Sequence, residues 1–422
     1  MGVLEVLFAI LMFTFTIGEV IRVNLGNSVF VKPVDLVAVI LILAWLVKEI
    51  RHSGNQASPK HPESPNTKRD SGQARMTSSI LLFVGVALIS LFVNIKYLSN
   101  SELIVSFSYL GRWVLYAGLY YVVRDFPFEF RKKIIFILAI SGALFVLFGL
   151  IQYFFYSNLR NLYYLGWDDH MHRLFSTFLD PNFAGSFFVL YFIFLCGILL
   201  YFLKKGRKKL AIITVLLLIT TLLCIFLTFS RSALFMLVVS SFTFLILVKR
   251  KKWILGLVFV SLVYVLLSYK NFYIENINLF RVVSAEARLD SAKNAIEIIK
   301  DSPFLGVGFN AYRYAKVRLG YLSQENAFLS HADAGTDNSF LFVLATTGFI
   351  GLLSFLYLLF CVLRRAYANY KLSKYSEIRY FMSVIVIASF VGIIIDSFFI
   401  NSLFYTFNMI WLWIVVGLLD SR

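Results

Sequence analysis

Residues 183–228 read FAGSFFVLYFIFLCGILLYFLKKGRKKLAIITVLLLITTLLCIFLT, and this stretch decides the fold. Two apolar runs, 183–203 and 210–228, are separated only by the basic segment 204–209. A helix needs about 20 mostly apolar residues to cross the hydrocarbon core of a bilayer. Lys and Arg accumulate in the cytoplasmic loops of membrane proteins. The stretch therefore predicts two antiparallel transmembrane helices joined by a cytoplasmic turn.

The composition extends this interpretation to the whole chain. Of its 422 residues, 59% are hydrophobic and 15% are charged, against about 25% charged in a soluble domain. The mean hydropathy is +0.79. A soluble fold could not cover that much apolar surface with polar groups. Cys196, Cys224 and Cys361 lie in apolar runs without CxxC spacing, so we expect neither a disulfide framework nor a zinc site.

Apolar runs of spanning length predict an all-α polytopic membrane protein with about twelve transmembrane helices. The first run lacks the basic segment and the cleavage site of a signal peptide, so we expect it to be a retained helix. The expected spans are 3–21, 30–48, 78–97, 101–122, 133–156, 183–203, 210–228, 232–248, 253–268, 337–362, 380–398 and 400–419.

The charges of the connecting loops give the expected orientation. Loops two, four, six, eight and ten each carry four to six Lys or Arg residues. The short outer loops carry fewer, namely Arg22, Lys32, Lys96, Arg160, Arg173 and Arg231. This alternation predicts that both termini are cytoplasmic. The net charge of +17 then reflects topology and contact with anionic lipid headgroups, so we expect no nucleic-acid partner.

Two long loops divide the chain. The expected regions are 1–48 (helices one and two), 49–77 (a disordered cytoplasmic loop), 78–268 (helices three to nine), 269–336 (a large external loop) and 337–422 (helices ten to twelve). The first loop is rich in Ser, Pro, Asn, Lys and His, which is typical of disorder. The second has helical periodicity, with Leu289, Ala292, Ile296 and Ile299 on one expected face. A long loop with its own short helices is usually functional.

Polar side chains gather on the expected outer side. They occur in Arg173–Asn182 (RLFSTFLDPN), in Phe229–Ser232 (FSRS), at Arg288, and in His331–Ser339 (HADAGTDNS). Two arginines suit a diphosphate, because the guanidinium fork matches phosphate oxygens and stays charged. A neighbouring carboxylate or imidazole could take a proton from an incoming hydroxyl. The sequence shows no metal-binding cluster and no GxxxxGK[ST] nucleotide loop.

Each of these residues also has a purely local explanation. Asx residues and Pro start helices, so the segments 180–182 and 337–339 could be caps. Arg231 could reach toward headgroups, Arg288 could lie on a solvated face, and His331 could be an ordinary loop residue. Inside the expected helices, Asp35, Arg112 and Asp396 should face the bundle interior. We expect these last three to brace the bundle.

Taken together, the four segments resemble the O-antigen ligase and O-antigen polymerase superfamily, the Wzy/WaaL-like bacterial membrane glycosyltransferases. The resemblance covers most of the chain and is strongest from 173 to 352. The matching stretches are Arg173–Asn182, Ser230-Arg231-Ser232, Arg288 with Ser302-Pro303-Phe-Leu-Gly306-Val-Gly308, and Asn338-Ser339 with Gly348 and Gly351. Their order and spacing make the combination more specific than any one motif.

The resemblance implies a C-type glycosyltransferase fold that works without metal or cofactor. It implies a glycan donor on undecaprenyl diphosphate and a glycan acceptor, with membrane lipids, a chain-length regulator and a flippase as further partners. Catalytic roles fall on Asp337, Arg231, Arg288 and His331, and substrate-binding roles on Arg173, Asn182, Asn338 and Ser230. The ligase pattern has His before the matching Asn, where this chain has Asp337, so His331 is the alternative base.

The leading functional hypothesis is polymerisation of lipid-linked repeat units into O-antigen, capsule or exopolysaccharide at the outer face of the bacterial cytoplasmic membrane. Ligase-type transfer of a glycan to a lipid or wall acceptor uses the same chemistry and is the second hypothesis. A polysaccharide transporter or flippase is an alternative of another class. Transporters usually carry charges within several helices and matching halves, a pattern that this sequence lacks.

Overall fold

The computed structural model describes residues 2–26, 29–54, 67–250, 252, 256, 283–325, 331–373 and 377–419. These residues are nearly all helical, and their one small sheet pairs Val23 with Val31 in an antiparallel ladder. The elements are α1 (Val3–Ile17), β1 (Val23–Asn24), β2 (Phe30–Val31), α2 (Pro33–Gly54), α3 (Thr67–Val93), η1 (Ile95–Tyr97), α4 (Asn100–Asp125), α5 (Phe128–Phe155), η2 (Arg160–Leu165), η3 (Ser176–Phe178), α6 (Pro181–Lys204), α7 (Lys208–Leu227), α8 (Arg231–Leu247), α10 (Val283–Asp301), α11 (Tyr312–Arg318), η6 (His331–Ala334), α12 (Ser339–Leu372), α13 (Glu377–Asp396), η8 (Ser402–Phe404) and α14 (Thr406–Gly417).

Six of these helices are long and apolar enough to cross a membrane. They are α3 (from Gly72), α5, α6, α7, α12 and α13, while α1, α8 and α14 are apolar but shorter. α2 and α4 coincide with two further expected spans. The ninth expected span, 253–268, lies outside the described residues apart from Gly256. The polytopic all-α membrane protein is confirmed, whereas the count of twelve spans stays a prediction.

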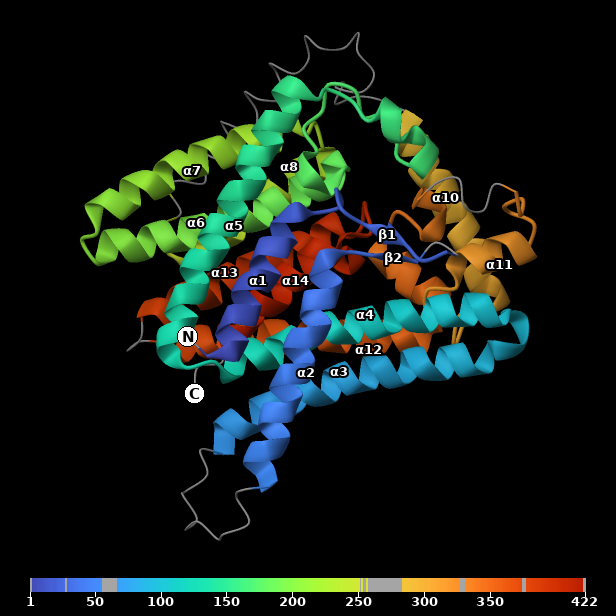
Figure 1. Ribbon diagram of the computed structural model, residues 1–422, viewed down its shortest axis with the longest axis horizontal. Helices are drawn as coiled ribbons and strands as arrows, with labels where there is room; N and C mark the ends of the chain where they lie inside the picture. Colours follow the sequence, from blue (N-terminus) through green and yellow to red (C-terminus); the bar gives the residue numbers. More distant parts are fainter. Residues whose placement is uncertain are drawn as a thin grey trace.

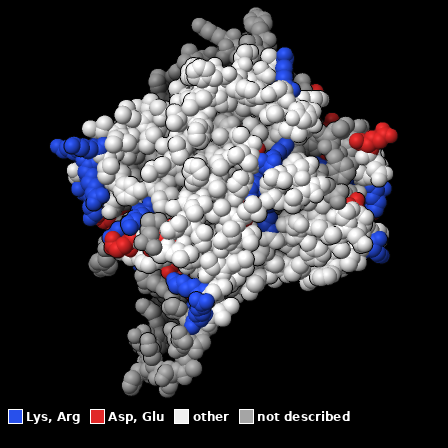
Figure 2. Space-filling model, viewed as in Figure 1, with Lys and Arg blue, Asp and Glu red and all other residues white. Residues whose placement is uncertain are grey.

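The bundle has two distinct ends (Figure 1). α10, α11 and the β1–β2 ladder lie at one end, and the turn between α6 and α7 lies at the other. The exposed basic residues of that turn, 204–209, form the group of blue side chains at the left of Figure 2. Most of the face in that view carries neither basic nor acidic residues, as expected for a surface in contact with lipid. The orientation of the termini stays a prediction.

Charged side chains within α2 and α4 neutralise one another. Arg112 in α4 lies 3.1 Å from the carboxylate of Asp35 in α2, and the Tyr116 hydroxyl donates to the same carboxylate. Nearby, Lys32 pairs with Glu19 at 2.7 Å, and both side chains are buried. Charges at membrane depth are costly unless they are paired. Asp35 and Arg112 therefore brace the bundle, as predicted.

The expected disordered loop 49–77 is shorter than predicted. α2 continues to Gly54 and α3 begins at Thr67, so both ends of the predicted loop are helical, and 55–66 lies outside the described residues. The early start of α3 is explained by its packing on α12. α3 runs against α12 so closely that a Cβ on Gly72 would lie 2.3 Å from the Arg365 guanidinium. A polar composition does not reveal that a helix continues past the membrane along a neighbour.

The amphipathic helix expected in the external loop is present as α10, and it ends at Asp301 as predicted. Its predicted apolar face is wrong in part, because Leu289 and Ile296 are exposed. The packed face instead carries Ala295, Ile298 and Ile299, which join a small cluster with residues of α11 and α12. The contact with α12 decides which side of α10 is buried, and this contact lies outside the helix's own sequence.

An aromatic core connects helices from both halves of the chain. Phe145 of α5 stacks on Phe178 of η3 with ring centroids 4.5 Å apart. Phe15 of α1, Phe187 of α6 and Phe407 of α14 pack around this pair. Aromatic pairs at such distances add to the stabilisation from burial. The core therefore holds η3, and with it the first motif segment, against α1, α5, α6 and α14.

Candidate functional site

The first motif segment, 173–182, is tied to α5 and α1 by hydrogen bonds. The Gln152 side chain of α5 accepts from the backbone N–H groups of Phe175 at 2.7 Å and Ser176 at 3.0 Å. The Ser176 hydroxyl donates to the Phe145 carbonyl of the same helix. Thr177 donates to the Thr16 carbonyl in α1. An irregular segment at this depth needs such partners for its backbone groups, and they give it one fixed path.

Arg173 links this segment to the turn between α7 and α8. Its side chain is 5% exposed. The guanidinium donates to the Thr228 carbonyl at 2.8 Å and to the side-chain oxygen of Asn182 at 3.1 Å. The backbone N–H of Leu174 donates to the Leu227 carbonyl beside it. Arg173 and Asn182 thus position each other, and substrate contact by either one stays a prediction.

Three of the sequence-predicted motifs begin helices. Asp180, Ser230 and Asn338 are the N-cap residues of α6, α8 and α12, and each accepts from backbone N–H groups of the first turn. Asn338 also donates to the Phe398 carbonyl at 3.2 Å. Side-chain oxygens at such positions satisfy donors that the helix leaves unpaired. The capping role predicted for 180–182 and 337–339 is therefore confirmed, and Ser230 is a further cap that the sequence analysis did not predict. Substrate binding by Ser230 or Asn338 stays a prediction.

The Pro-x-x-Gly-x-Gly segment after α10 fits into a break in α12. The backbone N–H of Val307 donates to the Ala345 carbonyl at 3.0 Å, and that of Phe349 donates to the Pro303 carbonyl at 2.8 Å. α12 loses its helical geometry at Gly348, where φ is +67°. A Cβ there would lie 2.1 Å from the Phe304 backbone. Two motifs that are separate in sequence therefore form one interlocked unit.

This unit brings Arg288 toward Asp337. Arg288 is half-buried on α10, one turn before Ser291, whose hydroxyl lies 3.2 Å from that of Thr336. Asp337 is the next residue after Thr336 in the sequence. Burial raises the pKa of Asp337, the negative charge of Asp180 raises it further, and the positive charge of Arg288 lowers it. The Asp337 residue is exposed, and charged groups of α10 and of the segment 173–182 act on its carboxylate.

Arg231 is the first residue of α8 and is half-buried. The next residue, Ser232, lies beside the carboxylate of Asp396 at the end of α13, and the charge of Arg288 also reaches that carboxylate. Asp396 is fully buried. Neither of its side-chain oxygens has a hydrogen bond of good geometry to any described residue. The sequence predicted Asp396 only as a brace, but the structure places its carboxylate beside Ser232, the neighbour of Arg231, and within reach of the charge of Arg288.

The structure describes His331 and His170 to different extents. His331 opens η6, but its side chain lies outside the described part, so its role as alternative base stays a prediction. His170, which the sequence analysis did not select, is buried with Nε2 3.9 Å from the Asp180 carboxylate. Burial lowers the pKa of His170, although Asp180 opposes this effect. Its position beside Asp180 depends on the path of a loop, and no local sequence signal indicates it.

Residues 213–356 match the family model for O-antigen ligase. This part of the chain, about a third of its length, is thus similar to the O-antigen ligase family. It contains Arg231, Arg288 and Asp337, whereas Arg173 and Asn182 precede it. No curated protein matches the chain. At a coarse level the family supports a membrane glycosyltransferase-like enzyme that joins glycans and uses lipid-linked substrates.

Proposed function

We propose that the protein polymerises undecaprenyl-diphosphate-linked oligosaccharide repeat units at the outer face of the bacterial cytoplasmic membrane. The supporting observation is the placement of Arg288 within electrostatic reach of Asp337, at the interlock of α10 with α12. On this proposal Arg231 and Arg288 hold the donor diphosphate. Guanidinium groups suit that task because they bind phosphate oxygens in a bidentate manner and remain charged.

The proposed reaction needs a base and an anion-binding group. An acceptor hydroxyl attacks the anomeric carbon of the donor sugar while Asp337 takes the hydroxyl proton. The bond from that carbon to the diphosphate breaks, and the lipid diphosphate leaves as an anion. The arginines stabilise the developing negative charge. The raised pKa of Asp337 brings this carboxylate closer to the range suited to general-base catalysis near neutral pH, with His331 as the alternative base.

Ligation to a lipid or wall acceptor is the second candidate function. The matched family model carries the description O-antigen ligase, and this observation favours it. The two reactions share the donor, the leaving group and the base. They differ only in the acceptor that occupies the site.

The test replaces Arg231 by Gln, Arg288 by Gln and Asp337 by Asn, one at a time, in the native host. Lys293→Gln and Asp290→Asn are matched controls, because these two residues form an exposed ion pair on α10. We expect loss of polymer from the three variants at unchanged protein level, and normal polymer from both controls. Accumulated single lipid-linked repeats support polymerisation, whereas accumulated long lipid-linked chains support ligation. Normal polymer from all three variants would contradict both.

A further inference from the structure

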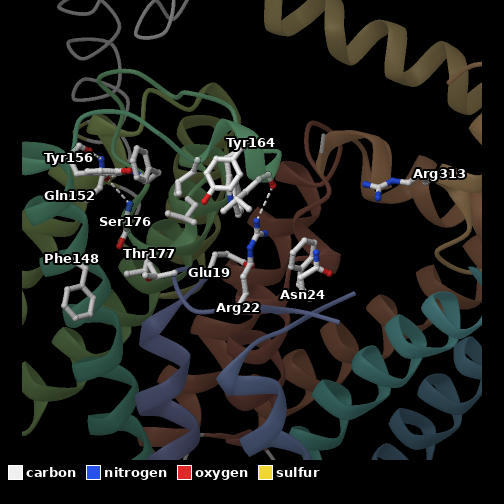
Figure 3. Close-up of a pocket in the computed structure, with 17 residues that line it drawn as sticks. Glu19, Arg22, Asn24, Phe148, Gln152, Tyr156, Tyr164, Ser176, Thr177 and Arg313 are labelled. Carbon is white, nitrogen blue, oxygen red and sulfur yellow. Dashed lines mark hydrogen bonds between the residues drawn. The ribbon is translucent and has the colours of Figure 1, made fainter. Parts of the chain in front are cut away.

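A large cavity lies beside the first motif segment, outside the set of residues assigned to the reaction. Its volume is about 820 Å³, within the range of about 300–1,000 Å³ for ligand pockets. It is lined by the loop after α1, the end of α5, η2 and η3, and Arg313 of α11 reaches toward it from the other side (Figure 3). The cavity therefore joins the N-terminal helices to the large external loop.

Aromatic rings make up much of the wall. Phe30, Tyr156, Tyr164 and Trp167 line the cavity, and Tyr164 is 80% exposed. Aromatic side chains combine large apolar faces with polar edges, which suits ligands that are themselves amphipathic. A pyranose ring is such a ligand, because one face presents C–H groups and the rim presents hydroxyls.

The wall also carries a net positive charge. Arg22 lies over the rings of Phe30 and Trp167, at 4.3 and 4.8 Å from the centroids, and Arg313 adds a second guanidinium from α11. The only carboxylate among the residues lining the cavity, Glu19, is already paired with Lys32 at 2.7 Å. Guanidinium groups bind carboxylates in a bidentate manner. The charge therefore favours an acidic ligand over a neutral one.

The cavity adjoins the proposed reaction centre. Leu179 is part of its wall, and the next residue, Asp180, caps α6 and raises the pKa of Asp337. A glycan seated in the cavity would thus lie against the segment that leads into Asp180, whose charge acts on Asp337. This arrangement suits the substrate that supplies the attacking hydroxyl, because that hydroxyl must lie beside the base.

We propose that this cavity is the acceptor subsite and that it binds an acidic segment of the acceptor glycan, with a sugar carboxylate held between Arg22 and Arg313. The acceptor role rests on the proposed function. The binding itself does not, because it can be measured without transfer.

The experiment measures binding to the full chain in phosphatidylcholine nanodiscs by isothermal titration calorimetry. The probes are trigalacturonate and the neutral trisaccharide maltotriose. We expect trigalacturonate to bind at least about tenfold more tightly, because charge-assisted hydrogen bonds outweigh neutral ones. Arg22→Gln and Arg313→Gln should each weaken its binding about tenfold or more, and Arg22→Lys should weaken it less. Arg160→Gln is the control, since Arg160 is an exposed arginine of η2 that does not line the cavity.

The outcomes separate the subsite from the transferase. Trigalacturonate binding that persists in Arg231→Gln and is lost in both cavity variants supports the subsite, whatever the transfer assay shows. Equal binding of the two probes would overturn the acidic-glycan assignment, and so would unchanged binding in folded Arg22→Gln and Arg313→Gln. Loss of trigalacturonate binding when phosphatidylglycerol replaces phosphatidylcholine would assign the cavity to a lipid headgroup and would also overturn it.

Discussion

The backbone N–H of Val307 donates to the carbonyl oxygen of Ala345 at 3.0 Å, which ties the segment after α10 to the first half of α12. The neighbouring Gly308 N–H donates to the Thr346 carbonyl, and the side chain of Asn94, directly after α3, donates to the Gly306 carbonyl. These bonds fix α10, and therefore Arg288, relative to the N-terminus of α12 and Asp337. Catalytic groups must be held within a fraction of an ångström.

Replacement of Gly306 by Ala should break this interlock. Gly306 has φ +66°, and an added Cβ would lie 2.4 Å from the backbone of Thr346. Gly320→Ala is the matched control, because φ there is +78° but no atom lies within 4 Å of the added Cβ. Left-handed backbone alone costs about 1–2 kcal/mol. Thermal unfolding of the purified protein should therefore show a clearly larger loss for Gly306→Ala, and equal losses would count against the interlock.

The acid side of the pH–activity profile should respond to Asp180. The charge of Asp180 raises the pKa of Asp337, and protonation of Asp337 removes the proposed base. In Asp180→Asn the pKa of Asp337 falls, so activity should persist to lower pH. Asn also caps helices well, so α6 should remain intact. The profile of initial transfer rate against pH checks this shift.

The opposite shift is expected when Arg288 is removed. Its charge lowers the pKa of Asp337, so the residual activity of Arg288→Gln should fall away at a higher pH than that of the parent protein. Asp290→Asn changes an exposed carboxylate on the same helix and should leave the profile unchanged. Identical acid limbs in the parent, Asp180→Asn and Arg288→Gln would exclude Asp337 as the titrating base and direct attention to His331.

Arg173 should be required for stability. In Arg173→Met the Thr228 carbonyl loses its buried donor, which costs about 1–3 kcal/mol for an unsatisfied buried group. Arg160→Met removes an arginine that is 65% exposed and should have little effect. The midpoint of thermal unfolding distinguishes the two variants. A midpoint for Arg173→Met equal to that of Arg160→Met would show that the link between 173 and 228 is dispensable.

Asp396→Asn should raise stability and reduce transfer. The buried carboxylate has no well-formed hydrogen bond to a described residue, and an unpaired buried charge is costly. Asn keeps the shape without the charge. Residues that lower stability in this way are retained at functional sites, and the Asp396 carboxylate lies beside Ser232, the neighbour of Arg231, and within reach of the charge of Arg288. A variant with lower thermal stability and full activity would contradict this assignment.

The sequence predicts the membrane-spanning elements well, because hydrophobic length and loop charge are local properties. Runs such as 183–203 and 210–228 correspond closely to α6 and α7. The loop 49–77 is predicted less well. Its α3 end passes close to Arg365 of α12 at Gly72, and this neighbour lies far away in the sequence.

The features of the candidate site could likewise be predicted only in part from the sequence. Arg231, Arg288 and Asp337 were selected because arginine and carboxylate are unusual at the expected outer face and because their segments resemble the superfamily; their roles stay predictions. The cap at 337–339 was predicted from the sequence, whereas the link made by Arg173 and the capping role of Ser230 needed the structure. The cavity could not be predicted at all, since Arg22 and Arg313 are separated by most of the chain. Both line the cavity only because α11 packs near the N-terminal loop.

The most direct test of the central claim is transfer by the purified protein in phosphatidylcholine nanodiscs, given undecaprenyl-diphosphate-linked repeat units isolated from a polymerisation-deficient host strain. The products are separated by size. We expect the parent protein and Lys293→Gln to give a ladder of lengthening lipid-linked glycans, and Arg231→Gln, Arg288→Gln and Asp337→Asn to leave most of the single repeat unconverted over the same time, with only a slow residual rate. A ladder of equal yield from all five proteins, or no ladder from the parent protein, would contradict the proposed polymerase.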